Sequence, residues 1–262
     1  MSGEAAEGRV VVEMSGKDVL PFLQGLVSND VLPLAKGPGL VWAALLTPQG
    51  KYLADFFVGH LPDGRMILDI PAALAEATLK RLAMYRLRAD VKMERTGLHV
   101  SRGTGPPPHH ALPDPRHPAL GWRLYSDAPG GPTVTDWDAI RVAHVIPESA
   151  VELQPEDAYI LEAGFERLHG VDFRKGCYVG QEVTARMKHK TELRKGLVRV
   201  LVEGDAAPGT TVLAGEREVG RLFTTAGGRG IAHLRLDRAE GAMQAGAAVV
   251  RLDPDWPGAA GG

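Results

Sequence analysis

The sequence predicts an α+β fold that ends in a small C-terminal β-barrel. In the first part of the chain, β-like runs alternate with apolar-periodic stretches and include a strand–turn–strand hairpin, as expected when helices cover one face of a mainly antiparallel sheet. After Arg194, short β-like runs separated by Gly, Pro and Asp recur at regular spacing, which is typical of a barrel. A length of 262 residues leaves room for more than one core.

The elements before residue 95 follow from local patterns. β-branched runs predict strands, apolar residues at helical spacing predict helices, and Thr47-Pro48-Gln49-Gly50 predicts a tight turn. Ser15 is placed to cap the first helix, and Pro71 suits the first turn of the second. In order, we expect a strand at 9–14, a helix at 18–26, a hairpin of strands 41–46 and 52–58, a strand at 65–70 and a helix at 71–87.

The later elements are shorter and more interrupted. Six prolines between residues 103 and 118 predict an exposed excursion, and its three histidines, at 109, 110 and 117, are expected to be solvated rather than metal-bound. Residues 136–144 have helical spacing, which predicts a short helix that ends before Pro147. We expect barrel strands at 197–202, 210–213, 218–225, 230–236 and 247–252, followed by a frayed tail over 254–262.

Charge, cysteine content and hydropathy exclude several classes of protein. A net charge of −2 argues against a protein that simply binds the nucleic-acid backbone. No apolar run reaches the roughly 18 residues of a membrane helix, and the N-terminus lacks a basic segment followed by an apolar one. A single cysteine excludes an internal disulfide and an all-cysteine metal site. We therefore expect a cytoplasmic protein with no direct nucleic-acid partner, no membrane partner and no stably bound metal.

The only cysteine precedes a predicted helix. The run from Gln181 has Glu182 in its first turn and Arg186 one turn later, a polarity that matches the helix dipole. Cys177 would then lie just before a helix N-terminus and beside Lys175, and both effects favour the thiolate. A lone cysteine is also often a small buried apolar residue, so these residues alone leave both interpretations open.

The segment Lys175-Gly176-Cys177-Tyr178-Val179-Gly180-Gln181-Glu182 resembles the signature of the YgfZ family of folate-binding proteins, which are related to the glycine-cleavage T-protein, an aminomethyltransferase. The resemblance extends along most of the chain. Four further parts of the sequence also match, in the expected order: Phe22-Leu23-Gln24-Gly25 with Asn29-Asp30-Val31, Leu46-Thr47-Pro48-Gln49-Gly50-Lys51, Ile146-Pro147-Glu148, and Gly170-Val171-Asp172-Phe173.

The resemblance implies a body of two related α+β halves that binds tetrahydrofolate or a derivative, followed by the barrel. It implies a role in making or repairing iron–sulfur enzymes, including a tRNA-modifying one, with those enzymes or cluster carriers as transient partners. The resemblance implies that Cys177 is the functional thiol. Because one thiolate cannot hold a cluster by itself, any contact with a cluster would be transient or shared. The domains expected are 1–95 for the first folate-binding half, 96–192 for the half with the cysteine motif, and 193–262 for the barrel and tail.

A folate site needs an apolar or aromatic wall, a few polar groups for the pterin edge and a cation for the carboxylate tail. Trp137 is the predicted wall, and Arg141, one helical turn later, is placed to meet the tail. Glu162 and Glu166 are four residues apart and would offer acceptors from one helix face. A core tryptophan, a surface arginine and a solvated acidic face are the structural alternatives. Gln181, Glu182 and Arg186 are expected to support Cys177.

Two other functions remain open. The first is folate-dependent aminomethyl transfer, as in the T-protein, whose hairpin strand typically carries consecutive aspartates, the first of which is the acid/base residue. This chain has Ala54-Asp55 there, and Ala54 cannot transfer a proton. Ala143 also replaces an expected pterin-holding glutamate. These departures favour folate binding without enzymatic chemistry. The second alternative is a non-catalytic protein-interaction module.

Overall fold

The computed structural model describes residues 3–189 and 194–256. The chain forms two compact units, of which unit 1 comprises residues 1–135 and 166–182, and unit 2 comprises 136–165 and 183–262. The predicted α+β class with a C-terminal barrel is confirmed. The compact units divide the chain at other positions than the predicted domain boundaries at 95/96 and 192/193. Those domain boundaries stay a prediction. No helix in the described residues is long and apolar enough to cross a membrane.

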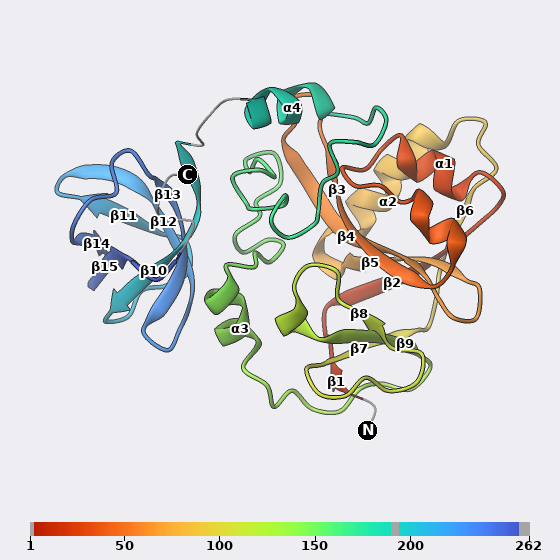
Figure 1. The fold of residues 1–262 in the computed structure, drawn as a ribbon, viewed down its shortest axis with the longest axis horizontal. Helices are drawn as coiled ribbons and strands as arrows, with labels where there is room; N and C mark the ends of the chain where they lie inside the picture. Colours follow the sequence, from red (N-terminus) through yellow and green to blue (C-terminus); the bar gives the residue numbers. More distant parts are fainter. Residues whose placement is uncertain (1–2, 190–193, 257–262) are drawn as a thin grey trace. The chain divides into compact units, whose positions relative to one another are not determined.

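Unit 1 is built around a five-stranded antiparallel sheet in the order β3-β4-β5-β2-β6 (Figure 1). The hairpin predicted from the Pro/Gly turn is confirmed as β3 and β4, and the strands predicted at 9–14 and 65–70 are confirmed as β2 and β5. Strand β6 was not predicted from its polar sequence. The bounds are β2 Arg9–Ser15, β3 Gly39–Leu46, β4 Tyr52–His60, β5 Met66–Pro71 and β6 Lys92–Arg95.

Helices α1 (Val19–Gln24) and α2 (Ala72–Arg86) cover one face of this sheet. Because side chains alternate along a strand, Val12 packs toward the helices and Val11 toward the opposite face. Ser15 does not cap α1. It ends β2, and Asp18 occupies the N-cap position.

The opposite face packs on a second sheet, in the order β1-β7-β9-β8. The proline-rich segment is therefore not wholly an exposed excursion, since Leu112 and Asp114 are buried and Leu112–Pro113 forms a strand. Pro113 is tolerated because this strand lies at the sheet edge. The bounds are β1 Glu4–Ala5, β7 His99–Gly103, β8 Leu112–Pro113 and β9 Trp122–Ser126, with 3-10 turns η1 Leu32–Lys36 and η2 Pro118–Leu120.

Unit 2 contains a closed six-stranded barrel, in the order β10-β13-β12-β11-β14-β15. Helix α3 (Trp137–His144) packs on it through Val142. Trp256 is buried in the barrel core, so the tail is not frayed up to that residue, and 257–262 lie outside the described residues. The bounds are β10 Lys195–Glu203, β11 Thr210–Ala214, β12 Arg217–Ala226, β13 Arg229–Arg235, β14 Met243–Ala245 and β15 Ala248–Leu252.

Candidate functional site

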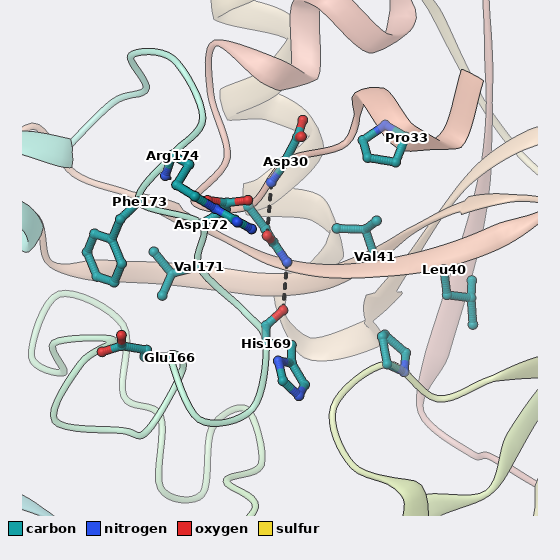
Figure 2. A pocket seen from close by; sticks show the side chains of 12 residues that line it. Asp30, Pro33, Leu40, Val41, Glu166, His169, Val171, Asp172, Phe173 and Arg174 are labelled. Carbon is teal, nitrogen blue, oxygen red and sulfur yellow. Dashed lines mark hydrogen bonds and ion pairs between the residues drawn. The ribbon is translucent and has the colours of Figure 1, made fainter. Parts of the chain in front are cut away.

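Unit 1 contains a pocket of about 630 Å³, a size that suits a small organic ligand. Figure 2 shows side chains from well-separated segments meeting there, with Arg174, Asp172 and Asp30 close together and Glu166 and His169 further along. Three carboxylates and an aromatic ring thus share one opening. The lining residues are Asn29, Asp30, Pro33, Leu40, Val41, Pro115, Glu166, His169, Val171, Asp172, Phe173 and Arg174.

One wall of the pocket is a clamp between residues 27–30 and 169–175. The Asn29 side-chain amide donates to the His169 carbonyl at 2.6 Å, a bond drawn in Figure 2. The Ser28 hydroxyl donates to the Gly170 carbonyl at 2.6 Å, and the Asp172 amide donates back to the Ser28 carbonyl at 3.1 Å. These bonds join segments about 140 residues apart in sequence.

Lys175 completes this clamp from inside. Its buried ammonium donates to the Val27 carbonyl at 2.5 Å and to the Asn29 carbonyl at 2.8 Å. Burial lowers the pKa of Lys175 to about 8, and the nearby carboxylates of Asp30 and Asp172 oppose that shift. Because its donors are directed at backbone carbonyls, Lys175 anchors the cysteine segment and does not present its charge to solvent.

Cys177 is exposed between two fixed points of the segment. On one side is Lys175, and on the other Val179 packs against the core of the central sheet. Gly180 has φ +83° and approaches the hairpin turn so closely that a Cβ there would lie 2.6 Å from the Thr47 carbonyl oxygen. The thiol is therefore presented by a held segment of chain.

Helix α4 (Gln181–His189) follows directly, which confirms the predicted helix after the cysteine. The Tyr178 amide donates to the Gln181 side-chain carbonyl at 3.3 Å, and the Gln181 amide donates to the Tyr178 carbonyl at 3.2 Å. Tyr178 is buried, and Lys175 Nζ lies 5.1 Å from the centre of its ring. Glu182 and Arg186 are exposed, so the predicted supporting role fits Gln181 best.

The residues predicted to hold folate separate between the two units. Glu166 lines the pocket of unit 1. Trp137, Arg141 and Glu162 belong to unit 2. Glu162 and Glu166 do not share a helix face, because residues 160–169 form successive turns rather than an α-helix.

The unit 2 candidates are engaged within their own unit. Trp137 is buried at the start of α3. The Arg141 guanidinium donates to Asp138 at 2.8 Å and pairs with the buried carboxylate of Glu152. Glu162 lies 3.0 Å from His233 Nε2. This geometry favours structural roles for Arg141 and Glu162, and their folate contacts stay predictions.

Strand β4 of the hairpin contains Ala54 and Asp55, the positions where the T-protein typically carries consecutive aspartates. Ala54 is packed in the core on the helix side of the sheet. The neighbouring Asp55 is buried and accepts bonds from Trp42 Nε1 at 2.8 Å and the Tyr52 hydroxyl at 2.6 Å. Asp55 is therefore held as a structural acceptor. Within residues 3–189 and 194–256, no group of three or more His, Cys, Asp or Glu side chains is placed to hold a metal.

Sequence reasoning missed most of the pocket. Asp30, Asp172 and Phe173 belong to segments that the family resemblance covers, but no pocket role was predicted for them or for Arg174. A signal did exist, since Asn29-Asp30-Val31 and Gly170-Val171-Asp172-Phe173 both matched the family. Nothing local indicated that these two segments pack together.

Comparisons with known proteins identify the family. The chain is 32% identical to the mitochondrial iron–sulfur cluster assembly factor IBA57 of Mus musculus, over 95% of this chain and 84% of the mouse protein. The chain belongs to the IBA57 family of iron–sulfur cluster assembly factors. The Homo sapiens IBA57 protein matches at 32% identity over 95% of the chain and 83% of its own length. The Mycosarcoma maydis IBA57 homolog is 36% identical over 72% of the chain, which spans only 54% of that relative.

Two further matches concern the fold. Residues 194–259 match the family model of the CAF17 C-terminal β-barrel domain. The crystal structure of the glycine cleavage system aminomethyltransferase T from Bartonella henselae superposes with a TM-score of 0.70, covering 95% of this chain and 85% of that chain at 12% identity. At that identity the likeness concerns the fold alone, and it confirms the expected T-protein-like architecture.

The comparisons correct one expectation. The IBA57 relatives from mouse, human and Mycosarcoma maydis are all named as mitochondrial proteins. The cytoplasmic location inferred from the single cysteine and the N-terminal composition is therefore wrong. Neither feature separates the cytosol from other compartments that keep thiols reduced.

Proposed function

We propose that this chain assists the assembly or repair of iron–sulfur proteins, and that Cys177 is the thiol through which it does so. The observation that carries the proposal is the exposed Cys177 on a segment held by Lys175 and Gly180. A single thiolate supplies too few ligands to own a cluster. Contact with a cluster or cluster carrier is therefore transient, and the cluster is cargo. The clients include tRNA-modifying iron–sulfur enzymes in this proposal.

Replacing Cys177 by alanine is expected to abolish rescue of iron–sulfur enzyme activity in cells that lack the wild-type protein. The side chain is exposed, so the substitution should change the free energy of unfolding by no more than about 0.5 kcal/mol. Cys177→Ser keeps the size of the side chain and should also fail, because a hydroxyl does not ionise as a thiol does. Full rescue by either variant, at normal protein levels, would contradict the functional thiol.

We also propose that tetrahydrofolate or a derivative occupies the pocket of unit 1. Glu166 and Asp30 supply acceptors for the amino and ring N–H groups of a pterin, and Phe173 supplies an aromatic surface. The Arg174 side chain is 92% exposed and suits the carboxylate tail at the pocket mouth. Ala54 and Ala143 supply no proton-transfer group, so the bound folate is a ligand of the assembly factor in this proposal.

The folate proposal is tested by calorimetric titration of the full chain with tetrahydrofolate. Glu166→Gln is expected to weaken binding about tenfold or more, because a charge-assisted hydrogen bond contributes about 1.5–3 kcal/mol. Glu162→Gln is the matched control and should bind as the wild type does, since Glu162 pairs with His233. Absence of both heat and thermal stabilisation at saturating ligand would refute folate binding. Loss of binding in the Glu162 variant alone would show that folate binds outside this pocket.

A further inference from the structure

The C-terminal end of α2 exposes two large apolar side chains. Leu87 is 89% exposed and Met84 is 67% exposed. They are three residues apart: Met84 lies in the last turn of α2, and Leu87 is the C-cap that directly follows the helix end. A single exposed leucine is ordinary. A pair at the end of one helix, with the more exposed member in an unusual backbone conformation, requires a reason.

The backbone at Leu87 is strained and held in place. Leu87 has φ +43° and ψ −103°, outside the regions that branched side chains normally adopt. The following turn is fixed to the β2–α1 connection, because the Asp90 amide donates to the Asp18 carboxylate at 2.9 Å and the Asp18 amide donates to the Asp90 carbonyl at 3.3 Å. A Cβ at Gly16 would lie 2.0 Å from the Asp90 carbonyl oxygen. Leu87 is thus presented by a packed turn.

Cations surround this pair. Arg86 and Arg88 flank Leu87 in sequence, and all the cations named below are exposed. The Asp18–Asp90 bonds bring the segment that contains Lys17 to the turn, and the pairing of Ser15 with Lys92 places that lysine beside the same segment. Lys80 lies one helical turn before Met84 on α2. The acidic side chains nearby are Asp18, Asp90, Glu94 and Glu76, which lies one turn before Lys80. We call the following set the α2 tip: Lys17, Lys80, Met84, Arg86, Leu87, Arg88 and Lys92.

We propose that the α2 tip binds an anionic lipid surface, with Leu87 and Met84 inserted among the acyl chains and the cations on the headgroup phosphates. Amphipathic segments with apolar side chains flanked by Lys and Arg bind membranes in this way. Long cationic side chains keep their charge at the headgroups while their stems remain apolar. A leucine that protrudes almost fully needs no shape-matched cavity in a fluid surface, whereas a protein partner would need one. The chain as a whole carries a net charge of −2, so the cations of the α2 tip form a local basic surface on an otherwise weakly acidic protein.

The test is co-sedimentation of the full chain with vesicles of phosphatidylcholine alone, or of phosphatidylcholine and phosphatidylserine in equal amounts. Binding is expected only to the mixed vesicles. Arg88→Gln should weaken it about fivefold. Leu87→Asn should weaken it about tenfold or more through loss of inserted apolar surface. Asparagine tolerates positive φ, so this variant should keep its fold, which its melting temperature checks.

Val134→Asn is the matched control, because Val134 is 83% exposed in the same unit but lies outside the α2 tip. It should bind mixed vesicles as the wild type does. Absence of binding to mixed vesicles at low salt would overturn the proposal and assign the α2 tip to an acidic protein surface. Equal binding by wild type and Leu87→Asn would also overturn it, since adsorption would then depend on charge alone. Neither result bears on Cys177 or on the folate pocket.

Discussion

Asp69→Asn is expected to lower the free energy of unfolding of unit 1 by about 3–5 kcal/mol, because it removes one partner of a buried ion-pair network. Asp69 is fully buried and accepts bonds from Arg9 Nε at 2.6 Å, an Arg123 terminal nitrogen at 2.7 Å and the Tyr125 hydroxyl at 2.9 Å. Arg9 and Asp69 lie in the five-stranded sheet, whereas Arg123 and Tyr125 lie in β9 of the other sheet. The carboxylate therefore joins the two sheets.

The network is also packed against an aromatic ring. The Arg123 guanidinium lies 4.3 Å from the centre of the Phe57 ring, and that of Arg9 lies 5.6 Å from it. Asparagine has the size of aspartate but would leave both guanidiniums without this carboxylate. Urea unfolding of the full chain, followed by a probe in unit 1, measures the loss.

The same substitution should remove part of the acid sensitivity of the protein. Burial alone would raise the pKa of Asp69, but the Arg9 and Arg123 charges outweigh it and lower the pKa from 3.8 to about 2. A carboxyl group with a lowered folded-state pKa stabilises the fold above its unfolded pKa and loses that contribution as the pH falls through the folded value. The wild type should therefore lose about 2 kcal/mol between about pH 4 and pH 2 from this group.

Asp63→Asn is the matched control for the stability measurement. Asp63 pairs with Arg65 at 2.7 Å, but both side chains are substantially exposed, and exposed pairs contribute about 0–1 kcal/mol. Equal destabilisation by the two substitutions would contradict the conclusion that the Asp69 carboxylate links the two sheets. An unchanged acid slope in Asp69→Asn would contradict its lowered pKa.

Gly180→Ala is expected to destabilise unit 1 by about 2–5 kcal/mol. A left-handed conformation costs about 1–2 kcal/mol for a residue with a Cβ, and overpacking typically adds about 1–3 kcal/mol. The added Cβ would lie 2.6 Å from the Thr47 carbonyl oxygen and 2.9 Å from Leu46 Cβ. The motif would have to withdraw from the hairpin turn, and Cys177 would move with it. Chemical denaturation measures the stability, and hydrogen exchange of residues 175–180 measures the loosening.

Gly176→Ala is the control within the same motif. A Cβ at Gly176 meets nothing within 4 Å, and its φ is not positive. It should change the free energy of unfolding by no more than about 0.5 kcal/mol. Equal protection of residues 175–180 in Gly180→Ala and wild type would show that the close approach of Gly180 does not hold the motif.

The local elements of this fold were predictable because their signals are local. The β3–β4 hairpin follows from a Pro/Gly turn between two apolar runs, and α3 from helical spacing that stops before Pro147. Strands β6 and β9 were missed because charged residues interrupt their apolar pattern. Strand β8 was missed because Pro113 argues against a strand everywhere except at a sheet edge, and edge position depends on the assembled sheet.

The candidate site was predictable only in part. The sequence alone determined that there is one thiol, that it lies in a family signature before a helix, and that the strand position expected to carry a proton-transfer aspartate is Ala54. The tertiary structure decided that Lys175 is buried against residues 27–29, that Glu166 rather than Glu162 lines the pocket, and that Arg141 is paired with Glu152. Periodicity and spacing report only on neighbours along the chain. Burial and partner choice depend on contacts such as Asn29 with His169, which only the folded chain brings together.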